Sequence, residues 1–343
     1  MRMTRLTVTA IPLLAGLMPA VAQTNWEVAK SFQIGGQGAW DYLTVDPQMH
    51  RLYVPRTTHT MVIDAESGKT IADIPGQKNA HGVALAPAAG RGFISDGGGD
   101  GAIVIFDLKT YAVLGSLAAM PDADGIIFDP TSGHVLVVSG RGKTLMSFKP
   151  DIDPKNGKID EPIALRGEPE FLAADEAGKV YINLMDTNEV AVVDFKARKV
   201  VANWPVAPGG APVGMSIDTK KGYLFIGCRK PQKLIVMSTH DGKVVADLPI
   251  GAGVDATKNY NGQAFASCLD GTLTVASETS PGQFANVQTV KTRRGARTMG
   301  LDPTTHRIYL PTSEFEEPKP GARGPAMKPD TFMIIVVKRH AGE

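Results

Sequence analysis

The chain has 343 residues, with 36 Lys and Arg against 35 Asp and Glu and a formal net charge of +1. This near-neutral balance gives no global electrostatic reason to bind nucleic acid or an anionic membrane. The 37 Gly and 24 Pro residues are spread along the sequence, which is typical of a fold with many turns and few helices.

Residues 1–22 have the pattern of a secretory signal peptide. Arg2 and Arg5 precede an apolar run from Leu6 to Met18, and Ala20-Val21-Ala22 forms a small-x-small cleavage site. The run is too short for a membrane span, and no later stretch approaches about 18 consecutive apolar residues. A buried N-terminal helix is the alternative interpretation. We predict cleavage after Ala22, a periplasmic or secreted location, and no membrane span.

Seven copies of one pattern follow. Each copy holds a short apolar strand, a turn, and then a second, third and fourth strand, as in RLYVP, TMVID and TIADI of the first copy. The first turn residues lie 40 to 46 positions apart and are Asp46, Ala86, Asp129, Asp175, Asp218, Asn259 and Asp302. Asp-Pro, Ser-Gly and Asp-Gly pairs at the corners favour hairpin turns. The period predicts an all-β, seven-bladed β-propeller with four antiparallel strands per blade. Two separate sandwiches are the alternative.

The seventh copy has only three strands, because it ends with MIIVVKRH at 333–340. The segment NWEVAKSFQIGG at 25–36 resembles a fourth strand, so we expect it to complete the last blade and close the ring. The predicted organisation is a single domain over 23–343, with an insertion at 314–329 in the last blade. A closed ring has no open edge to cover, and we expect a monomer.

The second-strand sequences RLYVP, KVYIN and RIYLP resemble the YVTN-type repeat of the YncE-like β-propeller family, from about Trp26 to His340. The sixth copy departs from it, with Asn259 at the turn and Ala264-Phe265 in place of Tyr-Val. The resemblance implies an exported seven-bladed propeller, in most members without known enzymatic activity. Some members are associated with nucleic acid or the cell envelope, and related propellers are lactonases or lyases.

In propellers, ligand sites usually gather where the loops before the first strands converge on the central channel, together with the loops between second and third strands. By this analogy the funnel-shaped face carries the ligand-binding residues, which we predict to be Trp40, Asp41, Tyr42, Arg56, His59, His81, Asp124, Arg141, Glu170, Arg229, Asp255 and Arg297. Polar residues at such a mouth can also be merely solvated. We interpret His50, His134 and His306 as turn residues of the opposite face.

No cofactor is evident, and a divalent metal is the one candidate. His81 with Asp41 or Asp124 could form a nitrogen and oxygen site, although no local ligand spacing indicates it. The run DGGGDG at 96–101 has glycine where a calcium loop needs ligands, so we interpret it as a hairpin loop. Cys228 and Cys268 end second strands of adjacent copies. Neighbouring blades diverge there beyond the roughly 7 Å that a disulfide spans, so we expect two thiols.

Sequence motifs of enzymes are missing, since the chain has no GxSxG, HExxH, Walker loop or CxxCH. The favoured function is therefore non-catalytic binding of a small polar ligand or a protein partner at the funnel face. One alternative is a lactonase-like hydrolase or lyase acting on a polar or anionic small molecule or glycan, with His81 as base, Tyr42 as acid and Arg297 as anion clamp. The other is single-stranded nucleic-acid binding, through the residues Arg229, Lys230, Arg293, Arg294, Arg297 and Trp40.

Overall fold

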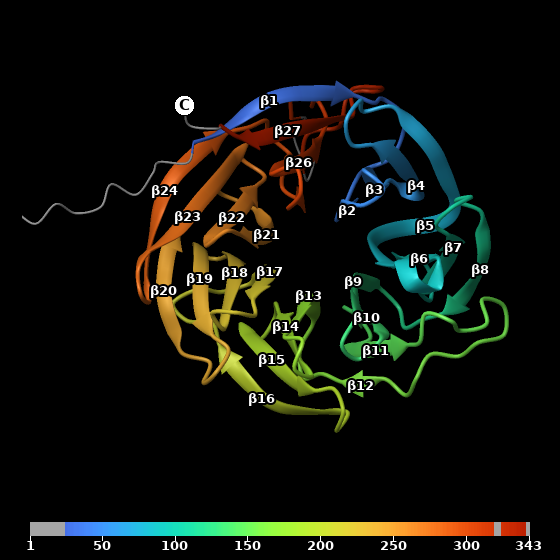
Figure 1. The fold of residues 1–343 in the computed structure, drawn as a ribbon, viewed down its shortest axis with the longest axis horizontal. Coiled ribbons are helices and arrows are strands. Elements are labelled where there is room, and N and C mark those ends of the chain that lie inside the picture. The colour runs from blue at the N-terminus through green and yellow to red at the C-terminus, as the bar shows by residue number, and fades with distance from the viewer. Residues whose placement is uncertain (1–24, 319–323, 341–343) are drawn as a thin grey trace, which may run out of the picture.

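The computed structural model describes residues 25–318 and 324–340. The predicted signal peptide and its cleavage site lie outside these described residues. Apart from one short 3-10 helix, η1 (Pro87–Ala89), the regular structure in this part of the chain is antiparallel β-sheet. Figure 1 shows the sheets arranged around a central axis. A search of the described residues finds no helix of the length and apolarity that a bilayer crossing requires.

Four consecutive sheets each contain four strands that pair in sequence order. Within each of them the first strand lies nearest the axis and the last lies at the rim (Figure 1). Their strands are β9 (Ala123–Asp129), β10 (His134–Ser139), β11 (Thr144–Phe148) and β12 (Ile163–Ala164); β13 (Pro169–Ala174), β14 (Lys179–Leu184), β15 (Glu189–Asp194) and β16 (Lys199–Pro205); β17 (Pro212–Asp218), β18 (Tyr223–Arg229), β19 (Gln232–Ser238) and β20 (Val244–Pro249); and β21 (Val254–Tyr260), β22 (Gln263–Cys268), β23 (Thr272–Ser280) and β24 (Gln283–Lys291). This arrangement is a propeller-like, all-β fold.

The sheet that precedes them has seven strands. They are β2 (Thr44–Asp46), β3 (Arg51–Pro55), β4 (Thr57–Asp64), β5 (Thr70–Ala86), β6 (Arg91–Asp96), β7 (Ala102–Asp107) and β8 (Val113–Ala118). The long β5 belongs to two units, because its first part pairs with β4 and its last part pairs with β6. Gly76 between the two parts has φ 97°, which glycine adopts without strain. The sequence predicted two separate strands here. In the structure they form one continuous strand, β5, which bends at Gly76.

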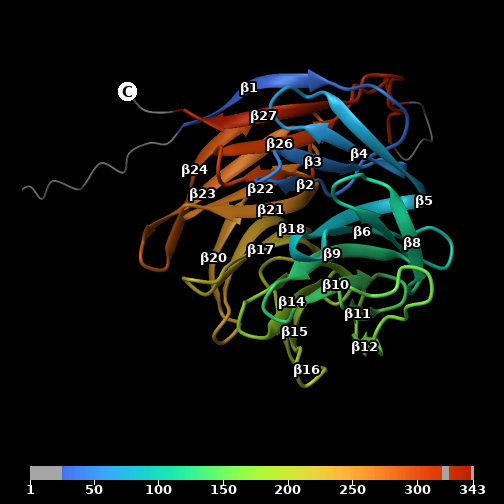
Figure 2. The same ribbon diagram turned by 45° about the vertical axis from the view of Figure 1, so that its right-hand side comes forward.

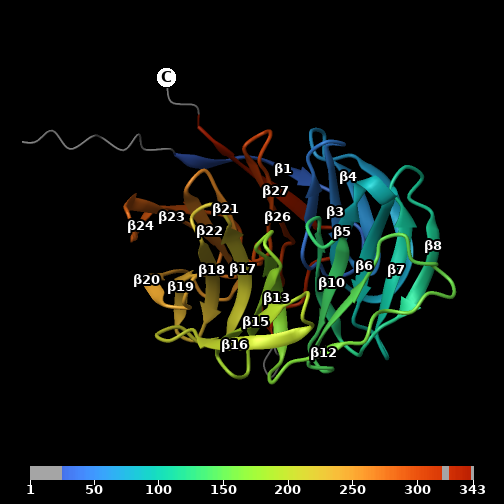
Figure 3. The same cartoon turned by 60° about the horizontal axis from the view of Figure 1, so that its bottom comes forward.

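The last sheet brings both ends of the described chain together. Its strands are β25 (Gly300–Asp302), β26 (Arg307–Thr312), β27 (Met333–Arg339) and β1 (Trp26–Gln33). Strand β1 pairs antiparallel with β27, so that Trp26 lies opposite Arg339 and Gln33 opposite Met333. This is the pairing predicted from the sequence. Figures 2 and 3 show β1, in blue, alongside β27, in red.

The core lies between the faces of neighbouring sheets. Leu52 and Val54 of β3 share one buried cluster with Tyr309 of β26 and Ile334 of β27, so the first and last sheets pack against each other. Tyr53, which lies between Leu52 and Val54, is also buried but belongs to another cluster, so β3 is covered on both faces. The packing of the first sheet on the last holds the sheets around the common axis.

The turns follow the aspartates of the repeat. The Asp46 carboxylate accepts hydrogen bonds of 3.0 Å from the backbone N–H groups of Gln48 and Met49. Equivalent bonds to residues two to four positions later are made by Asp129, Asp175, Asp218 and Asp302. A side chain that mimics a backbone turn in this way fixes where each hairpin bends. The sixth copy, which has Asn259 instead, turns at Asn261-Gly262 with both φ values positive, as a tight hairpin requires.

Candidate functional site

Eight side chains line a cavity of about 150 Å³ at one end of the central axis, which we call the funnel cavity. Each of the six sheets formed by the described residues contributes to it. Most of these side chains stand in or just before a strand nearest the axis, as the repeat predicted, and one ends the second strand β18. The eight are Asp41, Tyr42, His81, Asp124, Glu170, Arg229, Asp255 and Arg297, and all of them belong to the set predicted from the sequence.

Carboxylates surround His81 on one side of the funnel cavity. Its Nδ1 lies 2.7 Å from Oδ2 of Asp41 and 3.6 Å from Oδ1 of Asp124, and its Nε2 lies 2.8 Å from the side-chain amide of Asn79. Burial lowers the pKa of His81, but the hydrogen bond to Asp41 and the charge of Asp124 outweigh it and raise the pKa to about 9. His81 is therefore an imidazolium at neutral pH. An imidazolium donates from both nitrogens, so Asn79 then turns its side-chain oxygen towards Nε2.

The other side of the cavity holds a neutralised carboxylate. Asp255 is 5% exposed and forms ion pairs with Arg229 Nη2 and, at 2.8 Å, with Arg297 Nε. The Tyr42 hydroxyl donates a 3.0 Å hydrogen bond to the backbone oxygen of Asp255. Burial raises the pKa of Asp255, and the two guanidinium groups oppose that rise. Both arginines are thus engaged by Asp255, which leaves them less available to an anionic ligand.

Within the described parts of the chain, Asp124 and Glu170 form no such ion pair with an arginine. Burial raises the pKa of Asp124 well above its ordinary value, even against the attraction of the His81 charge. Burial also raises the pKa of Glu170 to about 7, although the charge of Arg229 lowers it. Carboxyl groups that hold protons near neutral pH because burial disfavours their charged form would exchange those protons for a bound cation.

Three of these side chains could hold a metal ion. Asp41, His81 and Asp124 each offer one ligand atom, and these atoms lie within 4.8 Å of one another. An imidazole nitrogen with carboxylate oxygens is a donor set that divalent transition metals accept. Because the His81 nitrogen nearest the two carboxylates is the one that bears a proton, binding a metal there would release that proton.

Arg56 and Trp40 do not line the funnel cavity. Arg56 is 1% exposed, donates to the backbone oxygens of Gly36 and Gly38, and stacks on the Phe332 ring at 3.6 Å. Trp40 is 8% exposed and packs on Phe332, with 5.7 Å between ring centroids. Both residues hold the N-terminal segment against the last sheet. The structure thus places both residues away from the funnel cavity, and their role in ligand binding stays a prediction.

His59 and Arg141 also lie outside the cavity lining. His59 Nδ1 is 3.2 Å from the Thr58 hydroxyl, and His59 Nε2 is 3.9 Å from Asp73, in the outer part of the first sheet. Arg141 is exposed in the loop between β10 and β11. Where the structure describes them, the connections between second and third strands reach the funnel cavity at Arg229 alone.

The predicted insertion at 314–329 forms a short hairpin where the structure describes it. Phe315 pairs with Met327 in an isolated bridge, and the Phe315 ring lies 6.3 Å from that of Trp40, centroid to centroid. The described part of the insertion therefore lies against Trp40 and does not line the funnel cavity.

Sequence reasoning predicted Tyr42 but missed Phe171, which lies against it at the inner end of the funnel cavity. The Tyr42 ring lies against the Phe171 ring, with 4.5 Å between centroids. Phe171 and Lys258 also line a second cavity, of about 620 Å³, which is formed by the strands nearest the axis and which we call the channel cavity. Tyr42 and Phe171 therefore stand between the two cavities. Phe171 and Lys258 sit in ordinary strand positions of the repeat, so nothing in the pattern singled them out.

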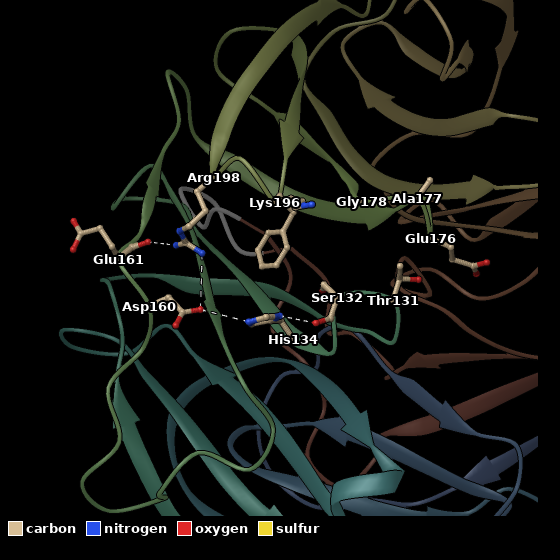
Figure 4. Close-up of a pocket in the computed structure, with 11 residues that line it drawn as sticks. Thr131, Ser132, His134, Asp160, Glu161, Glu176, Ala177, Gly178, Lys196 and Arg198 are labelled. Carbon is tan, nitrogen blue, oxygen red and sulfur yellow. Dashed lines mark hydrogen bonds and ion pairs between the residues drawn. The ribbon is translucent and has the colours of Figure 1, made fainter.

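A groove of about 780 Å³ lies between the sheet of β9–β12 and that of β13–β16 (Figure 4). His134 was interpreted as a turn residue, but it begins β10 and faces this groove, 3.9 Å from Asp160. Arg198 lies 3.9 Å from the same Asp160 carboxylate and donates to the backbone oxygen of Glu161. The histidine, aspartate and arginine here satisfy one another, as expected of a structural contact between sheets.

The two cysteines are buried free thiols. Cys228 and Cys268 are both 0% exposed. Burial raises the pKa of each thiol to about 12, so neither carries a thiolate at neutral pH.

No protein-family model matches the sequence, and no curated protein matches it. Among solved structures, the chain is similar to one of Kuenenia stuttgartiensis hydrazine synthase, with a TM-score of 0.68 and 12% sequence identity. The similarity covers 86% of this chain and 96% of that chain. At this identity the likeness shows the fold alone, which with the four-stranded sheets is propeller-like.

Proposed function

We propose that the chain is an exported, seven-bladed β-propeller that binds a small ligand carrying a positively charged group in the funnel cavity, without catalysing a reaction. The observation that carries the proposal is the convergence of eight side chains from six sheets on one cavity. In it the carboxyl groups of Asp41 and Asp124 lie beside His81 and Glu170 shares the lining, while Asp255 already engages both arginines.

The six sheets become seven blades if the seven-stranded sheet is divided within β5 into two blades. Strand β1 then forms the outer strand of the last blade. The lining of the channel cavity supports this number, because it includes residues of β2, β5, β9, β13, β17, β21 and β25. The relationship to the YncE-like family is proposed on the sequences RLYVP in β3, KVYIN at the start of β14 and RIYLP in β26. The signal-peptide pattern of residues 1–22 supports export to the periplasm or the medium.

The size of the funnel cavity restricts what enters it. Binding sites for whole organic ligands usually measure about 300–1,000 Å³. A volume of about 150 Å³ suits one charged group, either a divalent ion or the ammonium end of a larger molecule. Such a cation would take the place of the protons that Asp124 and Glu170 hold.

Elemental mass spectrometry tests whether the exported protein binds a divalent ion after equilibration with Mn²⁺, Ca²⁺ or Zn²⁺. We expect one ion per chain in the wild type and in His59→Ala, and none in His81→Ala. His59→Ala is the matched control because His59 lies outside the cavity. Melting curves of the variants establish that they fold. If the wild type binds none of the three ions and putrescine does not raise its melting temperature, the cationic ligand is refuted.

A hydrolase or lyase at the same cavity is the second candidate, and the Glu170 carboxyl favours it. A group with a pKa of about 7 is suited to accept and donate protons at neutral pH. The assignment of His81 as base does not fit, because its pKa of about 9 keeps it protonated. Arg297 pairs with Asp255, so it is not a free anion clamp. Turnover of a lactone panel by the wild type, lost in Glu170→Gln, would favour this candidate over simple binding.

Single-stranded nucleic-acid binding has the weakest support. It needs exposed aromatic rings on which bases stack. Trp40 is only 8% exposed, and Arg229 and Arg297 are paired with Asp255. Arg293 lies 3.8 Å from Glu314, which reduces the basic character of the remaining patch.

A further inference from the structure

The channel cavity is large and predominantly apolar. Its volume of about 620 Å³ falls within the range of about 300–1,000 Å³ that is usual for small-molecule sites. Its apolar lining includes Leu43, Val45, Leu85, Phe128, Ile217 and Leu301. Of the acids at its rim, Asp129 is committed to a turn, since its carboxylate accepts hydrogen bonds from the backbone N–H groups of Thr131 and Ser132.

One lysine stands at the inner end of this cavity without a counter-charge. Among the described residues, no hydrogen bond or ion pair reaches the Lys258 ammonium, and its one recorded partner is the Phe171 ring at 5.8 Å. Burial lowers the pKa of Lys258, and no carboxylate opposes that effect. A single ring at this distance compensates only part of the loss of hydration, so the ammonium lacks an anion.

A second unpartnered polar group lines the same cavity. Ser216, on the neighbouring strand β17, is 8% exposed, and its hydroxyl has no hydrogen-bond partner in the described structure. Buried hydroxyl groups are nearly always hydrogen-bonded, and a missing partner can indicate an absent ligand. Lys258 on β21 and Ser216 on β17 belong to contacting strands of neighbouring sheets, and both residues line this cavity.

We infer that the channel cavity binds a small amphipathic anion, a single carboxylate on an apolar body, with the carboxylate held by Lys258 and Ser216. The apolar walls accept the body of such a ligand and gain from its removal from water. One ammonium neutralises one carboxylate, whereas a ligand with several charges would bury some of them unpaired. Tyr42 and Phe171 close the inner end, so this site is independent of the ligand proposed for the funnel cavity.

Calorimetric titration with octanoate tests the inference, with 1-octanol as the uncharged comparison. We expect the wild type and the exposed control Lys291→Met to bind one octanoate. Lys258→Met should bind it at least about tenfold more weakly, since the loss of the ammonium removes a charge-assisted hydrogen bond to the carboxylate. The preference of the wild type for octanoate over octanol should disappear in Lys258→Met. Ser216→Ala should weaken octanoate binding to a smaller extent.

The folding of Lys258→Met is checked by its melting temperature, which should equal or exceed that of the wild type because a partly buried, unpaired charge is removed. His81→Ala should bind octanoate like the wild type, which separates this site from the proposed function of the funnel cavity. Equal octanoate affinity in the wild type and Lys258→Met would overturn the inference. So would a wild type that does not bind octanoate, or that binds octanol equally well.

Discussion

The indole of Trp26 meets the ring of Phe265 edge to face, with 4.9 Å between the ring centroids. Its Nε1 donates a 2.9 Å hydrogen bond to the side chain of Gln263, and Trp26 is only 2% exposed. The N-terminal strand is therefore attached to β22 of the adjacent sheet as well as to β27 of its own.

Trp26→Ala should lower the free energy of unfolding by about 3–5 kcal/mol, because it leaves a large cavity between two sheets. Val28→Ala on the same strand is the control. Val28 is 42% exposed, and its truncation should change stability by less than about 0.5 kcal/mol. Denaturant unfolding of both variants measures the difference. Similar effects of the two substitutions would contradict the role given to Trp26.

Arg56→Lys should destabilise the fold by about 2–3 kcal/mol, although it retains the charge. A lysine ammonium cannot reproduce the planar fork that bonds the oxygens of Gly36 and Gly38, so a buried cation keeps fewer hydrogen-bond partners and these carbonyl groups lose theirs. Thermal unfolding measures the loss. Arg141→Lys, at an exposed position, should leave stability unchanged, and neither variant should alter cation binding in the funnel cavity. Reduced cation binding in a folded Arg56→Lys would show that Arg56 acts on that cavity.

The stability of the metal-free protein should fall as pH rises from about 5 to 9. The pKa of Glu170 rises on folding from 4.5 to about 7. The stability that Glu170 contributes is therefore complete below pH 4.5 and is lost as pH rises through 7. The pKa of His81 rises on folding from 6.5 to about 9, so the stability that His81 contributes is lost as pH rises between these values. In Glu170→Gln the decrease below pH 7 should shrink and the decrease above it should remain. Unfolding free energies at a series of pH values test this, and an unchanged profile would refute the Glu170 assignment.

The two thiols should resist alkylation. In the folded protein at pH 8, iodoacetamide should modify neither Cys228 nor Cys268, because both are fully buried and protonated. After denaturation both should react. Intact-mass measurement before and after denaturant distinguishes the states, and rapid labelling of the native protein would contradict the buried position of either thiol.

The repeat made much of this molecule predictable. Because the turn aspartates recur at a regular interval, the first residues of each inner strand could be located, and Asp41, His81 and Asp124 were identified although they lie far apart in sequence. The same logic failed at Arg56, whose partners are carbonyl groups of residues 36 and 38 that no repeat position specifies. It failed at His134 because the start of β10 and the preceding turn look alike in sequence. Lys258 was missed because it lies in the copy with the faintest pattern, where an unpaired charge resembles an exposed strand residue.

The pairing of β1 with β27 places the backbone N–H of His340 2.7 Å from the backbone oxygen of Asn25. A short peptide linker could therefore join these two positions, and new termini could be opened in a distant turn such as the one between β20 and β21. Such a circular permutant would retain every strand pair described above. The position of the N- and C-termini is thus set by the order of the gene. The arrangement of the sheets around the axis does not depend on that position.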